Sequence, residues 1–266
     1  MTKRFNVRFS GPEDARPMLF AHGFGCDQTM WRHVAPAFSD RFRVITYDLV
    51  GAGGSAPAAW DPERYLTLDG YADDLVDLVR GLDLRDVVFV GHSVAAMIGA
   101  LAQVREPDRF DRLVMVGPSP RYLDDDGYVG GFTEEAIEGL LESLSSNYLG
   151  WSAAMAPVIV GNPDRPQLGE ELTEVFCRMD PAVARVFARA TFLTDTRDVL
   201  PRVTAPTLVL QCSDDVIAPR CVGEYVAQTI PRSTLVNMRA TGHCPNLSAP
   251  EETVDVIRSY LDEDAA

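Results

Sequence analysis

The fold is indicated most clearly by residues 87 to 97, VVFVGHSVAAM. The first four of these residues are apolar and predict a buried strand, and the small apolar residues from Val94 onward predict a buried helix. Gly91 and Ala95 flank Ser93, as in the G-x-S-x-G pattern with alanine in the last place. Small flanks are needed because a serine at such a sharp turn has strained backbone geometry and close neighbours. The context therefore predicts a nucleophilic serine at position 93.

A nucleophilic serine needs a base, and the base needs an acid that orients it. The chain has four histidines. We predict His243 as the base, because it lies in a loop between the last predicted strand and the last predicted helix. His92 adjoins the serine and leaves the turn in another direction, whereas His22 lies in an early loop and His33 in a helical stretch.

The acid is expected after the strand Thr207–Gln211, where Asp214 and Asp215 stand side by side. We predict Asp215 as the acid and Asp214 as its solvated neighbour. The chain order is then serine, acid, histidine, which is the order of α/β hydrolases. Three roles at the ends of three strands, in this order, are more specific than any single motif.

Backbone donors for a developing oxyanion are predicted in the early loop HGFG, residues 22 to 25. The N–H of Phe24 would act together with the N–H of Val94, which follows the serine at the start of a helix. Each such donor is typically worth about 2.7–4 kcal/mol in the transition state. The ring of Phe24 can also line the substrate pocket.

Short apolar runs recur along the chain, and most are nearly continuous, as expected for strands buried on both faces of a parallel sheet. The runs are Phe5–Phe9, Met18–Ala21, Arg43–Asp48, Val87–Gly91, Leu113–Gly117, Thr207–Gln211 and Thr234–Met238. Phe5–Phe9 alternates and is predicted to be an outer antiparallel strand. Helical patterns separate the runs, which predicts a doubly wound, mostly parallel sheet of the α/β-hydrolase type.

One stretch breaks this alternation. Residues 133–196 contain no convincing strand and four helical patterns, at Thr133–Ser145, Asn147–Val160, Gln167–Met179 and Pro181–Leu193. We predict a four-helix cap at 133–196, inserted into a core made of residues 1–132 and 197–266. Ordinary crossover helices are the alternative, and four in a row without a strand argue against them.

The chain has 266 residues and a formal net charge of −15. Such an acidic surface repels phosphate backbones and anionic lipids, so neither nucleic acid nor a membrane is an expected partner. Five widely spaced cysteines favour reduced thiols and a cytoplasmic location. The polar N-terminus predicts no signal peptide, and no apolar run approaches the ~20 residues of a membrane span. No metal motif is visible, and we expect no cofactor.

The stretch Gly51–Ala56 formally matches a dinucleotide-binding pattern. Such a site needs a helix to begin there and present its N-terminus to pyrophosphate. Pro57 and Pro62 follow closely instead, and no helical period starts before about Leu68. A tight loop is therefore predicted.

Several stretches give the chain a family resemblance. It resembles the RsbQ-like hydrolases, bacterial proteins that regulate the general stress-response sigma factor, and more distantly the plant strigolactone and karrikin receptors. The matching stretches are 21–28 (AHGFGCDQ), 66–72 (LTLDGYA), 90–94 (VGHSV), 116–120 (VGPSP), 130–132 (GGF) and 242–245 (GHCP).

The resemblance implies a triad of Ser93, Asp215 and His243 and a small apolar cavity under a V-shaped cap. The residues expected to line this cavity are Phe24, Tyr122, Phe132, Trp151, Met155, Thr191, Phe192 and Ile217. Met155 stands where the plant receptors carry phenylalanine, and Ile217 where one carries a small polar residue. These departures argue against strigolactone itself and leave an apolar ester or lactone.

The expected activity is hydrolysis of a small hydrophobic ester or lactone through an acyl-enzyme on Ser93. The resemblance further implies a signalling role with a partner phosphatase that carries a PAS sensor domain. Alternatives are a receptor-like binding module with slow hydrolysis, and a metabolic carboxylesterase or perhydrolase without a signalling partner. Haloalkane dehalogenation is disfavoured because that chemistry uses aspartate at the position of the serine.

Overall fold

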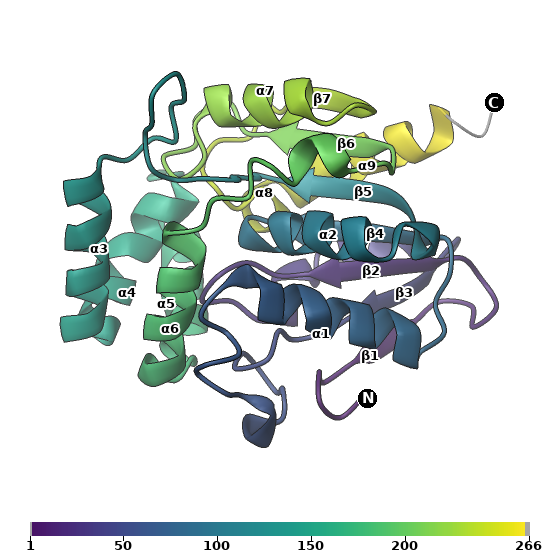
Figure 1. Ribbon diagram of the computed structural model, residues 1–266, viewed down its shortest axis with the longest axis horizontal. Coiled ribbons are helices and arrows are strands. Elements are labelled where there is room, and N and C mark those ends of the chain that lie inside the picture. Colours follow the sequence, from purple (N-terminus) through teal and green to yellow (C-terminus); the bar gives the residue numbers. More distant parts are fainter. Residues whose placement is uncertain (1, 264–266) are drawn as a thin grey trace.

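A single sheet of seven strands forms the centre of the protein in a computed structural model that describes residues 2–263 (Figure 1). The strands are β1 (Arg8–Ser10), β2 (Pro17–Ala21), β3 (Arg43–Thr46), β4 (Val87–His92), β5 (Phe110–Val116), β6 (Thr207–Gln211) and β7 (Ser233–Asn237). Their spatial order is β1-β3-β2-β4-β5-β6-β7. β1 pairs antiparallel with β3, and the other pairings are parallel. The predicted doubly wound, mostly parallel sheet is confirmed.

The first strand lies further along the chain than predicted. Pairing with β3 begins only at Arg8, opposite Thr46. Phe5 is fully buried and its carbonyl accepts a hydrogen bond from the N–H of Asp48 at 2.9 Å, but it lies in a turn. Asn6 has a φ of 46°, which is incompatible with an extended strand. The alternation that suggested a strand therefore reflects one buried ring beside a turn.

Helices cover both faces of the sheet. The α-helices are α1 (Leu68–Gly81), α2 (Val94–Arg105), α3 (Glu134–Ser146), α4 (Tyr148–Val160), α5 (Pro166–Cys177), α6 (Pro181–Phe192), α7 (Arg220–Thr229), α8 (Pro245–Ser248) and α9 (Pro250–Glu263). The shorter 3-10 helices are η1 (Gln28–Trp31), η2 (Ala35–Phe38), η3 (Pro57–Ala59), η4 (Pro107–Arg109) and η5 (Leu200–Arg202). Buried residues of α1, α2 and α7 belong to one core layer, and those of η2 and α9 belong to the other, together with Trp31 of η1.

The four consecutive helices α3, α4, α5 and α6 lie between β5 and β6 in the chain. Figure 1 shows them together beside the sheet, at the end toward which the parallel strands point. Polar side chains cap three of their N-termini: Thr133 binds the N–H of Ala136, Asn147 that of Gly150, and Asp180 that of Ala182. Each of the four predicted helical patterns is a helix in the structure.

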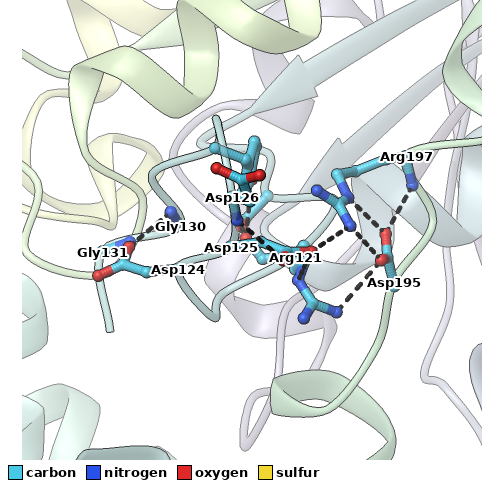
Figure 2. Close-up of polar contacts among 10 residues, drawn as sticks. Arg121, Asp124, Asp125, Asp126, Gly130, Gly131, Asp195 and Arg197 are labelled. Atoms are coloured by element: carbon cyan, nitrogen blue, oxygen red, sulfur yellow. Dashed lines mark hydrogen bonds and ion pairs between the residues drawn. The ribbon is translucent and has the colours of Figure 1, made fainter. Parts of the chain in front are cut away.

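Ion pairs connect the two segments through which the chain enters and leaves these helices (Figure 2). Arg197 binds Asp125 at 2.8 Å and Asp195 at 2.7 Å, and Arg121 binds Asp195 at 3.1 Å. Arg121 and Asp125 follow β5, whereas Asp195 and Arg197 follow α6. The network therefore fixes the start and the end of the helical segment beside each other.

The loop that imitates a dinucleotide-binding motif contains turns and leads into η3. The next α-helix begins only at Leu68. A Cβ on Gly53 would lie 2.5 Å from the Asp48 carboxyl group, and the N–H of Gly54 donates to that carboxylate at 2.8 Å. The glycines therefore allow a tight loop around a buried aspartate, as predicted.

Two glycine substitutions test how tightly the turn around Ser93 is packed. A Cβ on Gly91 would lie 2.7 Å from backbone atoms of Ala95, so Gly91→Ala should destabilise the protein by about 1–3 kcal/mol. A Cβ on the exposed helical Gly139 would meet nothing within 4 Å, so Gly139→Ala should stabilise by about 0.4–1 kcal/mol. Thermal and urea unfolding measure both changes. Equal stability of the two variants would contradict the packing described for the turn.

Candidate active site

Ser93 occupies a strained turn between β4 and α2. Its φ is 58° and its ψ −126°, outside the regions that residues with a side chain normally adopt. The neighbouring strand holds the turn, since the N–H of Ser93 donates to the carbonyl of Val116 at 2.8 Å. Gly91 lies against the backbone of Ala95 and leaves no room for a side chain. The serine hydroxyl is thereby presented at the carboxyl end of the central strand.

His243 contacts Ser93, and Asp215 contacts His243, although both residues are distant from Ser93 in sequence. The Nε2 atom of His243 lies 2.8 Å from the Ser93 hydroxyl, and its Nδ1 atom lies 2.8 Å from a carboxylate oxygen of Asp215. All three residues are at least 94% buried. Because an ionised carboxylate only accepts hydrogen bonds, Nδ1 carries the proton and Nε2 is left to accept the one from the hydroxyl. This arrangement can remove a proton from Ser93.

Several donors hold the Asp215 carboxylate. Burial raises its pKa, but the charge and hydrogen bond of His243 and the N–H groups of Ala218 and Ile217 outweigh this, so the pKa is lowered. The two N–H groups donate to one carboxylate oxygen at 3.0 Å and 2.8 Å, which leaves the other for the histidine. The neighbouring Asp214 is exposed, and only its backbone carbonyl meets the histidine loop, accepting from Gly242 at 2.6 Å.

The loop after β2 lies directly against the serine. A Cβ on Gly23 would lie 3.2 Å from the Cβ of Ser93, so only glycine allows the loop to come this close. His22 fixes the loop from behind: its Nδ1 donates to the carbonyl of Gly23 at 2.9 Å, and its Nε2 accepts from the N–H of Leu49 at 3.0 Å. Burial lowers the pKa of His22, which favours the neutral ring that this bonding requires.

The two predicted oxyanion donors are the residues that directly follow Gly23 and Ser93 in the chain. Phe24 follows Gly23 in the loop. Val94 is the first residue of α2, where a backbone N–H has no acceptor within the helix. The backbone N–H of Val94 and the positive end of the helix dipole are therefore available to an anion beside the serine.

A small, mostly apolar cavity adjoins Ser93, with an open volume of about 30 Å³. This room holds no more than a few water molecules, so a larger ligand has to displace side chains or helices on entry. The residues that line the cavity are Phe24, Cys26, His92, Ser93, Tyr122, Trp151, Ile159, Phe176, Thr191, Phe192, Ile217, His243 and Cys244.

Six of the eight residues predicted for the pocket are among these. Phe132 and Met155 are not: both are half-buried and pack against the core outside the cavity lining. Sequence reasoning missed Ile159 and Phe176, which belong to α4 and α5 and read only as apolar helix positions. It also missed Cys244, although this residue directly follows His243.

Aromatic rings connect the loop of Phe24 to the inserted helices. The ring centroid of Phe24 lies 6.0 Å from that of Trp151, 6.2 Å from that of Phe176 and 6.0 Å from that of Phe192. These partners come from α4, α5 and α6. Residues of these three helices therefore line the cavity together with Phe24.

The polar atoms in this lining are few. The indole N–H of Trp151 and the hydroxyl of Thr191 are buried and have no hydrogen-bond partner among residues 2–263. Burial raises the pKa of Tyr122 to about 12, so its phenol stays protonated. Burial also raises the pKa of the Cys26 and Cys244 thiols, which disfavours the nucleophilic thiolate at both. The thiols therefore do not compete with the hydroxyl of Ser93, which is the candidate nucleophile of this cavity.

A larger groove of about 1320 Å³ lies between the N-terminal part of α1, the end of α2 and the helices α3 and α6. Its lining combines apolar side chains with charges of both signs, such as Arg185 and Glu138, and includes none of Ser93, Asp215 and His243. We therefore assign the chemistry to the smaller cavity. Among residues 2–263, no group of three His, Cys, Asp or Glu side chains could hold a metal ion. No helix in this range is long and apolar enough to cross a membrane.

Comparisons with known proteins show the family to which the chain belongs. The model of the α/β hydrolase family matches residues 18–256. Strigolactone esterase D14 of Arabidopsis thaliana is 40% identical over 257 residues, 96% of each chain, and Karrikin insensitive 2 receptor CA of Petunia hybrida is 36% identical, covering 98% and 97%. The structure of a hydrolase from Oleispira antarctica superposes with a TM-score of 0.95 at 37% identity, covering 98% of this chain and 96% of the other.

The adjacent aspartates provide a matched test of the hydrogen-bonded chain. Asp215→Asn removes the carboxylate that holds the Nδ1 proton of His243, so Ser93 should react roughly 10²–10⁴-fold more slowly with a fluorophosphonate. Asp214→Asn changes an exposed side chain with no contact to the histidine and should leave the rate unchanged. Labelling kinetics followed by intact-protein mass spectrometry measure both. A loss on Asp214→Asn with none on Asp215→Asn would contradict the assignment of the acid.

Proposed function

Because this chain belongs to the α/β hydrolase family, we propose that it is a serine hydrolase that cleaves a small apolar ester or lactone through an acyl-enzyme on Ser93. The observation that carries the proposal is the unbroken chain from the serine hydroxyl to Nε2 and from Nδ1 to the carboxylate, with 2.8 Å at each step. This series of hydrogen bonds ends at the cavity, which Ser93 and His243 line.

The reaction follows from the positions of these groups. His243 accepts the hydroxyl proton at Nε2 while the Ser93 oxygen attacks the ester carbonyl. The carbonyl oxygen becomes an oxyanion, which the N–H groups of Phe24 and Val94 stabilise. His243 then protonates the departing alkoxide, and the same base activates a water molecule that releases the acid from the serine. Asp215 holds the ring and stabilises its positive charge.

The cavity supports the proposed substrate class. Its small volume and aromatic roof favour a short apolar acyl group. The unpartnered donors on Trp151 and Thr191 favour a ligand with an oxygen beyond the reacting carbonyl, as in a lactone or a hydroxylated ester. The name of the Arabidopsis relative, an esterase, agrees with this class.

We further propose that residues 133–196 act as a cap on a core formed by residues 1–132 and 197–266. The contacts of Phe24 with three inserted helices support this division, because they close the cavity from above. The ion pairs at the base of the segment hold its two ends together, so the helices can move as a unit.

Replacement of the serine tests the proposal. Ser93→Ala should lower kcat for p-nitrophenyl acetate by at least about 10³-fold, because it removes the attacking oxygen. Ser152→Ala removes another buried hydroxyl, which donates to the carbonyl of Tyr148 at 2.8 Å, and should retain activity. Steady-state kinetics with purified variants measure both. Unchanged turnover in Ser93→Ala would refute a serine hydrolase.

As a second candidate, we propose a signalling role like that of the RsbQ-like hydrolases, with a PAS-domain phosphatase as partner. The small cavity favours it, since a ligand larger than the open volume of about 30 Å³ has to displace the surrounding helices, and relatives named as receptors agree.

The signalling role predicts that Ser93→Ala protein, loaded with an ester that it cannot hydrolyse, captures a phosphatase or another signalling protein from extracts of its own cells. The same bait without ester is the control. This role would be contradicted if the wild-type protein shows fast multiple turnover with weak ligand binding and the Ser93→Ala bait captures no partner with or without ligand.

A further inference from the structure

The loop that carries His243 is attached to the inserted helices, and the attachment begins with its backbone. The N–H of His243 donates to the carbonyl of Ile159, in the last turn of α4, at 2.8 Å. On the other side, Nε2 of His92 donates to the carbonyl of His243 at 2.8 Å. Burial lowers the pKa of His92 to about 3, so this ring is neutral at physiological pH. The peptide groups on both sides of the histidine are thereby held.

Close packing reinforces this contact. Gly242 has a φ of 78°, and a Cβ there would lie 1.7 Å from the carbonyl oxygen of Val160. The end of α4 and the histidine loop therefore touch backbone to backbone, a contact that only glycine permits at position 242.

One side chain joins the two segments at this point. The amide nitrogen of Asn162 donates to the carbonyl of Val160 at 2.9 Å and to the carbonyl of Thr241 at 3.1 Å. Its amide oxygen accepts from the guanidinium of Arg165, which also donates to the carbonyl of Ser248 at 2.7 Å. With both ends of the amide occupied, its orientation is fixed. Asn162 has a φ of 58°, a conformation that asparagine tolerates better than most residues.

We propose that Asn162, supported by Arg165, is a positioning residue for the reaction: it fastens the turn between α4 and α5 to the loop of His243. This inference rests on the proposed function, since it assigns the base to His243. Asn162 touches neither Ser93 nor the cavity lining and acts two residues away from the base, through the carbonyl of Thr241. The helices that roof the cavity thus also set the position of the catalytic base.

Two substitutions remove the amide donor while sparing the backbone. Asn162→Gly keeps the left-handed conformation and loses the side chain, and Asn162→Asp replaces the donor by an oxygen that only accepts. Both should lower kcat for p-nitrophenyl acetate by about tenfold, because a small displacement of a catalytic group is costly, and leave KM within about twofold. Reaction of Ser93 with a fluorophosphonate should slow in parallel, since it needs the same base.

Asn147→Ala is the matched control. Asn147 caps the other end of α4, accepting from the N–H of Gly150 at 3.0 Å, and has no contact with the histidine loop. This variant should lower the melting temperature yet keep kcat per folded molecule. Wild-type kcat in both Asn162 variants, or an equal loss in Asn147→Ala, would overturn the inference. If the wild type itself shows no turnover that depends on Ser93, the proposed function fails first and the inference with it.

Discussion

The strained backbone at Ser93 fixes where the candidate active site can form. A residue with φ of 58° persists only where its surroundings force it, and here the N–H bond to Val116 and the contact of Gly91 with Ala95 do so. The strain places one hydroxyl at the end of the central parallel strand, beside the first N–H groups of a helix. Every other group of the candidate site has to be brought to that point.

The other groups arrive from loops that follow three further strands, and each loop is held by backbone contacts. His22 fixes the loop of Gly23, two N–H groups hold the carboxylate of Asp215, and the last turn of α4 holds His243. The hydrogen bonds within the site are therefore the outcome of packing elsewhere. This explains how a site of neutral or paired groups can be almost completely buried without an isolated charge.

The sequence alone could predict the part of this arrangement that follows from local pattern and chain order. A strand, a small-residue turn and a buried helix predicted Ser93, and the positions after two strands predicted Asp215 and His243; the structure brings these three side chains together. Contacts between distant backbone atoms have no local signal, so no pattern in the sequence connects Asn162 to the loop of His243. The same limit applies to the cavity: Phe132 and Met155 have suitable side chains, but their orientation is decided by helix packing.

The covalent intermediate tests most directly whether Ser93 is the nucleophile. An aryl carbamate acylates a catalytic serine and leaves it slowly, so the modified protein can be digested and its peptides mapped by mass spectrometry. We expect one carbamoyl group per chain, on Ser93, and none after Ser93→Ala. Modification of Cys26 or Cys244 instead, or no modification while the aryl ester is still hydrolysed, would contradict this expectation.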